Sequence, residues 1–204
     1  FRKYLLWATE QNRPWNEMFR DMLAGDETDE NQNAALQFVK HRAKSLDDLT
    51  NDTAVLFFGV NVSCAKCHDH PLVEDWKQDH YYGMQSFFSR TFLTKKQGLG
   101  EKFYGEVKFT TTAGVEKQAK FMFLNGAVVD DGTPELDDES RKKYDALVKK
   151  LQQDDKVEVS YPEFRPRQRL VETASHKDNN EFLARNIVNR MWHRLTGRGI
   201  VDPP

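Results

Sequence analysis

The chain has 204 residues, and its 30 basic side chains against 32 acidic ones leave a formal net charge of −2 at pH 7. Aromatic residues make up 12% of the sequence, which excludes a disordered chain because such a content fills a packed core. The balanced charge provides no basic field to attract nucleic acid or an anionic membrane. No apolar run approaches the ~20 residues of a transmembrane segment. The length suits one medium domain or two small ones, because a single hydrophobic core extends over roughly 100–200 residues.

Apolar residues at helical spacing dominate the first half of the chain. Their spacing predicts a helix over 1–24 that is divided at Asn12-Arg13-Pro14, followed by a polar loop over 25–32. A second helix is expected over 33–44. The apolar run within 52–59 suits a strand as well as a helix, and we expect a short buried helix there.

Beyond residue 102 the apolar spacing changes to every second position. Alternation over 103–109 and 121–123, on either side of a turn at 110–114, predicts an antiparallel hairpin. The alternating residues Val157, Val159 and Tyr161 suggest a third strand. Between these strands, 137–153 has the pattern of a charged amphipathic helix.

A linker at 162–166 and a helix over 180–195 complete the predicted elements. The apolar side of this helix consists of Phe182, Ile187, Met191 and Trp192. The order of elements indicates an α+β fold, with a mainly helical core and a small antiparallel β insertion. We divide the chain into a helical domain at 1–100, a β insertion with one charged helix at 101–162, and a linker with a closing helix at 163–204.

The two cysteines of the chain lie three positions apart, within Cys64-Ala65-Lys66-Cys67-His68. This C-x-x-C-H spacing is typical of covalent haem attachment, in which two thiols on one helical face form thioethers to the porphyrin vinyl groups. The histidine after the second cysteine then reaches the iron as its proximal ligand. The motif therefore predicts a haem c bound by Cys64 and Cys67, with His68 on iron.

Two other interpretations of the same residues stay open. Two thiolates and two imidazoles suit tetrahedral zinc, so Cys64 and Cys67 would form a zinc site with two of His68, His70 and His80. Alternatively, the two thiols form a disulfide or remain free, because C-x-x-C by itself is also a redox motif.

Several residues are candidates for the sixth position on a haem iron. Met84, His80 and His70 are the nearest in sequence, and His176 and His193 follow later. Met ligation would raise the reduction potential relative to a second histidine. An open position would instead favour small-ligand binding or peroxide chemistry. Met84 is equally suited to core packing, and His70 to a hydrogen bond beside the haem.

Four stretches of the chain resemble one protein family. They are 13–26, 58–71 (FGVNVSCAKCHDHP), 76–88 (WKQDHYYGMQSFF), and 184–192 (ARNIVNRMW) with 197–199. The resemblance is to large exported planctomycete proteins that pair two domains of unknown function and often carry a separate planctomycete cytochrome c domain. This chain departs from the family pattern at His80, where an acidic residue is expected, and at Met84, where Leu is commoner.

The resemblance implies an exported protein with a cytochrome-like role, of which this chain is an internal piece. It also implies that the last helix starts a following domain. Together with the C-x-x-C-H motif, the resemblance predicts electron transfer to a redox partner, which is a separate protein, a further domain or a member of a larger complex. It also predicts a location in the periplasm or otherwise outside the cytoplasm. The alternatives are a non-haem structural or zinc-binding module built on Cys64, Cys67, His68 and His70, and a haem enzyme with an open iron site.

Overall fold

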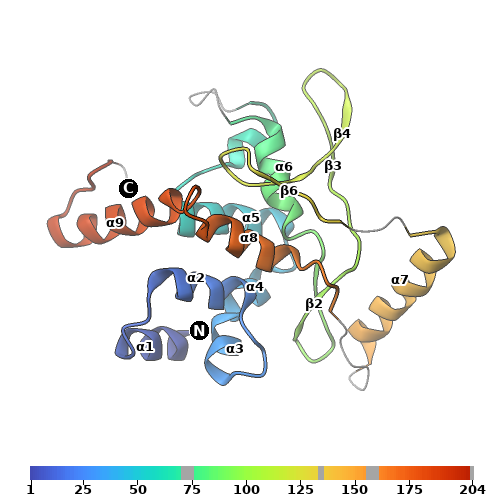
Figure 1. The fold of residues 1–204 in the computed structure, drawn as a ribbon, viewed down its shortest axis with the longest axis horizontal. Coiled ribbons are helices and arrows are strands. Elements are labelled where there is room, and N and C mark those ends of the chain that lie inside the picture. Colours follow the sequence, from blue (N-terminus) through green and yellow to red (C-terminus); the bar gives the residue numbers. More distant parts are fainter. Residues whose placement is uncertain (70–75, 133–135, 155–160, 203–204) are drawn as a thin grey trace.

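The computed structural model describes residues 1–69, 76–132, 136–154 and 161–202. Helices form the first part of the chain and its last part, and three two-stranded antiparallel sheets lie between them in the described residues (Figure 1). The fold is therefore α+β, as the element order predicts. None of the helices in these ranges combines the length and apolar character that crossing a bilayer requires.

The first part of the chain contains helices that are short and closely packed. In order they are α1 (Arg2–Glu10), α2 (Trp15–Ala24), α3 (Glu30–Ala35), α4 (Gln37–Arg42), α5 (Leu46–Thr53), the π-helix η1 (Ala54–Phe58), the 3₁₀ helix η2 (Ser63–Lys66) and α6 (Gln78–Ser86). The predicted division at residues 12–14 is confirmed, because Asn12 adopts a left-handed φ of 48° and Pro14 precedes α2.

Three predicted boundaries in this part are wrong, and in two of them a side chain caps a helix that begins earlier than expected. The loop expected over 25–32 ends early because the Asp29 side chain accepts the Gln32 N–H and begins α3. The helix expected over 33–44 divides at Leu36. The helix expected over 52–59 begins earlier, since Ser45 caps α5 through the Asp48 N–H.

The three sheets are hairpins. They pair β1 (Thr91–Leu93) with β2 (Leu99–Glu101), β3 (Lys108–Thr110) with β4 (Glu116–Gln118), and β5 (Phe121–Met122) with β6 (Val128–Val129). A turn at 110–114 is confirmed, and there Gly114 has a φ of 77°.

The predicted hairpin across 110–114 is confirmed, but its strands are 108–110 and 116–118, and the expected pairing with 121–123 is wrong. The carbonyl groups of Phe103 and Gly105 accept hydrogen bonds from the Arg90 guanidinium, so the first residues of the expected strand bind a side chain. Residues 121–122 pair with β6 instead. Most of the third predicted strand, Val157 to Tyr161, lies outside the described residues, and Tyr161 itself is not in a strand.

The last part of the chain holds three helices, α7 (Asp138–Gln153), α8 (Pro166–Ser175) and α9 (Glu181–Thr196). The helices predicted over 137–153 and 180–195 are confirmed within one residue. Helix α8 was not predicted, and it begins at Pro166 within the expected linker. Proline suits the first turn of a helix, where its missing N–H has no partner to lose.

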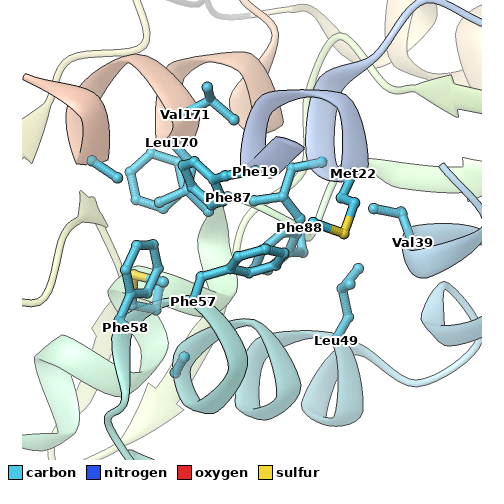
Figure 2. Close-up of a cluster of buried hydrophobic side chains, with 14 of the residues drawn as sticks. Phe19, Met22, Val39, Leu49, Phe57, Phe58, Phe87, Phe88, Leu170 and Val171 are labelled. Atoms are coloured by element: carbon cyan, nitrogen blue, oxygen red, sulfur yellow. The ribbon is translucent and has the colours of Figure 1, made fainter. Parts of the chain in front are cut away.

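A cluster of buried side chains joins these helices (Figure 2). The Phe19 ring of α2 lies 4.9 Å from that of Phe57 and 5.6 Å from that of Phe58, both in η1. Leu170 and Val171 of α8 belong to the same cluster. Residues from both ends of the chain therefore share one core, while the division into three segments stays a prediction.

A buried ion pair fixes α8 against the rest. The Glu101 carboxylate, 1% exposed, accepts the Nε–H groups of Arg165 and Arg167 at 3.1 Å each. The Arg167 guanidinium, itself buried, also donates to the Leu23 carbonyl at 2.7 Å. Strand β2 and helices α2 and α8 thus meet at Arg167.

We expect Glu101→Ala to lower the free energy of unfolding by about 3–5 kcal/mol, because it leaves the buried Arg167 charge without its carboxylate. Glu139→Ala is the matched control, since the pair between Glu139 and Lys143 is exposed and is expected to add little. Urea denaturation of both variants measures the difference. An equal decrease in the free energy of unfolding of the two variants would contradict a stabilising role for the Glu101 ion pair.

Candidate functional site

The two cysteines lie on an exposed turn whose other side is buried. Cys64 is within η2 and Cys67 directly follows it, and both thiols are free and exposed. Val62 and Ala65 are fully buried beneath them. This alternation fixes the turn, which we call the thiol turn (residues 63–68), to the core and leaves both sulfur atoms facing outward.

The π-helix and α9 position the chain that leads into the thiol turn. Asn186 of α9 donates to the Leu56 carbonyl at 2.7 Å, and Arg190 donates to the Val55 carbonyl at 2.9 Å. Gly59 follows with a φ of 68°, and a Cβ there would lie 2.8 Å from the Asn186 side-chain oxygen. Only glycine fits this left-handed turn beneath α9.

Lys66, in the middle of the thiol turn, is held through both its backbone and its side chain. Its carbonyl accepts the Tyr82 hydroxyl at 3.0 Å and the Gln78 amide at 3.3 Å, both from α6. Its Nζ lies 2.6 Å from the Asp47 carboxylate of α5. The turn is therefore clamped between α5 and α6.

The Asp47 carboxylate accepts two further hydrogen bonds. The Tyr81 hydroxyl donates at 2.7 Å and the Gln85 amide at 2.8 Å, so three donors from two elements meet at one carboxylate. The Lys66 hydrogen bond, followed by that of Tyr81, holds the pKa of Asp47 below its usual value. Burial, and then the bond to Asp47, raise the pKa of Tyr81. The network therefore favours a charged Asp47 and a neutral Tyr81.

The imidazole of His68 is exposed and oriented by its neighbour. Its Nδ1 lies 2.7 Å from the Asp69 carbonyl oxygen. Because a carbonyl oxygen only accepts, Nδ1 is the nitrogen that donates in this contact, and Nε2 takes no part in it. The Asp69 carboxylate in turn accepts the Gln78 N–H at the start of α6, at 3.3 Å. Histidines that bind metals commonly have this arrangement, with one ring nitrogen donating to a carbonyl.

The other predicted ligands lie in different surroundings. Met84 is fully buried in the core cluster, and the Nδ1 atom of His80 accepts the Lys77 N–H at the start of α6. His176 lies after α8, with its Nδ1 3.4 Å from the Asp178 carboxylate, and His193 lies on α9. His70 lies outside the described residues. Roles for these side chains on iron stay predictions.

Within the described ranges, no three His, Cys, Asp or Glu side chains are grouped as a metal site. The described part of the chain therefore gives the zinc alternative no support, and a site that uses His70 lies outside it. The thiols also form no disulfide with one another. What the structure brings together is the thiol turn, with its two sulfur atoms and the His68 ring, on the support of α5 and α6.

Sequence reasoning identified Cys64, Cys67 and His68 but missed their support. Tyr82, which supports the turn through its hydroxyl, stacks on Phe109 with ring centres 4.3 Å apart. No signal in the sequence marked Asp47. It lies beside Ser45 and Asp48 at the start of α5, where polar residues are common at any helix.

Comparison with known families covers the part of the chain that holds this site. Residues 1–92 match the family model PSCyt2, described as a protein of unknown function (DUF1549). The name associates the family with planctomycete cytochrome c domains, in agreement with the resemblance stated above. The match includes the thiol turn, α5 and α6. No curated protein and no solved structure gives a significant match.

We expect Asp47→Asn to weaken the acid dependence of folding. The lowered pKa of Asp47 means that its stabilisation is complete above its unfolded value of 3.8 and is lost as the pH falls below it. The variant should unfold about 1 kcal/mol more easily at neutral pH, because neutral hydrogen bonds replace charged ones. Its stability should also fall less steeply in acid.

Asp48→Asn is the matched control, because it removes the same charge from the same helical turn but from an exposed position. Chemical denaturation across acidic to neutral pH measures both variants. If the free energy of unfolding of the two variants falls equally with pH in acid, Asp47 does not clamp the thiol turn.

Proposed function

We propose that this chain binds a haem c covalently through Cys64 and Cys67, with the Nε2 atom of His68 on iron, and serves in electron transfer. The observation that carries the proposal is the oriented His68 ring directly beside two exposed, unpaired thiols at C-x-x-C-H spacing. The match of this part of the chain to a cytochrome-associated family supports it.

The residues present fit such a group in their chemistry. Thioether formation needs two thiols that an enzyme of haem attachment can reach, and both are exposed. Iron ligation needs a ring nitrogen that makes no other bond, and the contact of Nδ1 with the Asp69 carbonyl leaves Nε2 for that role. When bound, the haem would supply one-electron chemistry at its iron.

The chain's own contribution is to hold the thiol turn still while leaving it open. The bonds from Tyr82 and Gln78 to Lys66 fix the backbone between the two cysteines. The Asp47 carboxylate neutralises the Lys66 ammonium. A partner therefore approaches a rigid turn at the surface, so the redox partner, a separate protein or a further domain, exchanges electrons there.

Because haem c is attached after export, we also propose a periplasmic or otherwise exported location. This is consistent with the exported proteins that the chain resembles. Both cysteines would then be consumed by thioethers and not by a disulfide.

Small-ligand binding at an open iron site is the second candidate function. The observation that favours it is the position of two candidate sixth ligands. The side chain of Met84 is fully buried among core residues, and the Nδ1 atom of His80 accepts a helix N–H. Carbon monoxide separates the two functions, because it binds an open ferrous iron and leaves the spectrum of a six-coordinate electron carrier unchanged.

The test is production of the whole chain in an exporting host that has a cytochrome c maturation system. We expect haem staining that survives denaturing electrophoresis and a c-type pyridine haemochrome spectrum. Cys64→Ser and Cys67→Ser should each weaken the stain, and the double variant should abolish it. His176→Gln, a substitution of an exposed histidine distant in sequence, is the control and should leave the stain unchanged.

An unmodified mass for the wild-type chain, in a host that loads a known cytochrome, would overturn the proposal. If the chain instead contains one equivalent of zinc, and a chelator that removes the zinc frees two thiols, the metal-binding alternative is correct.

A further inference from the structure

The β3–β4 hairpin is attached to the first two turns of α6, the helix that supports the thiol turn (Figure 1). The Tyr82 ring stacks on that of Phe109 in β3, with an interplanar angle of 13°. The Asp79 carboxylate pairs with the Lys117 ammonium of β4 at 3.1 Å. The hairpin lies beyond residue 92, so it is outside the part of the chain that matches the family model.

Gln78 makes a third contact between α6 and the hairpin, and this residue is only 6% exposed. Its Oε1 accepts the Thr112 N–H in the hairpin turn at 3.2 Å, and its Nε2 donates to the Lys66 carbonyl at 3.3 Å. Its backbone N–H donates to the Asp69 carboxylate at 3.3 Å. One residue therefore binds the hairpin, the middle of the thiol turn and the residue that follows that turn.

The Thr112 N–H determines which way the Gln78 amide faces. An amide group accepts hydrogen bonds through its oxygen and donates them through its nitrogen. A donor on the hairpin side therefore holds the oxygen there and turns the NH₂ group towards the Lys66 carbonyl. In the reversed orientation two acceptors would oppose each other, and the buried Lys66 carbonyl would lose this donor.

The residues that Gln78 binds lie on either side of Cys67 and His68. Lys66 precedes this pair and Asp69 follows it. The Asp69 carbonyl in turn contacts the His68 Nδ1 at 2.7 Å. Holding both flanks restricts the backbone between them, so Gln78 acts on the second thiol and on the imidazole through their neighbours.

We propose that Gln78 is a positioning residue for Cys67 and His68, and that the β3–β4 hairpin belongs to the site because it orients the Gln78 amide. The inference rests on the proposed function, in which these two residues hold the haem and its iron. Hydrogen bonds behind a metal-binding histidine fix its orientation and strengthen it as a ligand. A more strongly donating imidazole favours ferric iron, so the hairpin would lower the reduction potential.

The test removes the Thr112 N–H and keeps the hairpin turn. The Gly114 N–H donates to the Thr111 carbonyl at 2.8 Å, so Thr112 occupies the first central position of this turn, where proline is favoured. Thr112→Pro therefore deletes the bond to Gln78 and leaves the turn intact. Thr112→Ala is the matched control, because it changes the same side chain and keeps the N–H. Gln78→Leu, of similar volume, removes the amide itself.

Hydrogen–deuterium exchange of the whole chain without haem is the first measurement. Amides of the thiol turn should exchange about two- to tenfold faster in Thr112→Pro than in Thr112→Ala or the wild type, which is the ratio that one neutral hydrogen bond supplies. Gln78→Leu should have at least the same effect. Thr112→Pro added to Gln78→Leu should cause no further change, since the hairpin acts through Gln78. The comparison between the two Thr112 variants is complete without Gln78→Leu.

The reduction potential of the haem-loaded chain is the second measurement, because a contact that only stabilises the fold would leave it unchanged. The potential should be higher in Thr112→Pro than in Thr112→Ala and the wild type. Equal exchange in the two Thr112 variants, a further effect of Thr112→Pro on Gln78→Leu, or equal potentials would each overturn the inference. A wild-type chain that attaches no haem would overturn the proposed function, and exchange of the thiol turn would then decide whether Gln78 positions it.

Discussion

The carboxylate of Asp47 is the point on which the arrangement of the candidate site depends. It joins Lys66 of the thiol turn to Tyr81 and Gln85 of α6, and it belongs to α5 itself. A negative charge that accepts three hydrogen bonds is stabilised by each of them, and each donor is thereby fixed. The C-x-x-C-H motif supplies the reactive atoms, but this carboxylate and the bonds to the Lys66 carbonyl hold the turn at the surface.

Features formed by residues close together in the sequence were predictable, and those formed by residues far apart were not. The thiols and His68 lie within five consecutive residues, and the amphipathic pattern of 137–153 is local, so both were found. Asp47, by contrast, binds partners 19, 34 and 38 residues away, and no pattern in one sequence records such a meeting. The error at the start of the predicted hairpin has the same origin, because Arg90 binds the carbonyl groups of Phe103 and Gly105, which alternation had assigned to a strand.

The π-helix η1 links the core to the thiol turn and to α9. Its wide turn places Phe57 and Phe58, adjacent in sequence, together in the buried aromatic cluster, which Figure 2 shows against α2 and α8. The carbonyl groups of Val55 and Leu56 accept hydrogen bonds from Arg190 and Asn186, which attaches α9 to η1. Carbonyl groups in the last turn of a helix have no partner further along the same helix, and the Asn186 amide supplies one for Leu56.

This attachment also fixes the chain that leads into the thiol turn. The thiol turn begins five residues after η1 ends, and α9 is bonded to η1 directly. The segment from η1 to Lys66 is therefore held near both of its ends, by Asn186 and Arg190 of α9 at the first and by α5 and α6 at the second. A haem on Cys64 and Cys67, as proposed, would be joined to a segment that several helices keep in place.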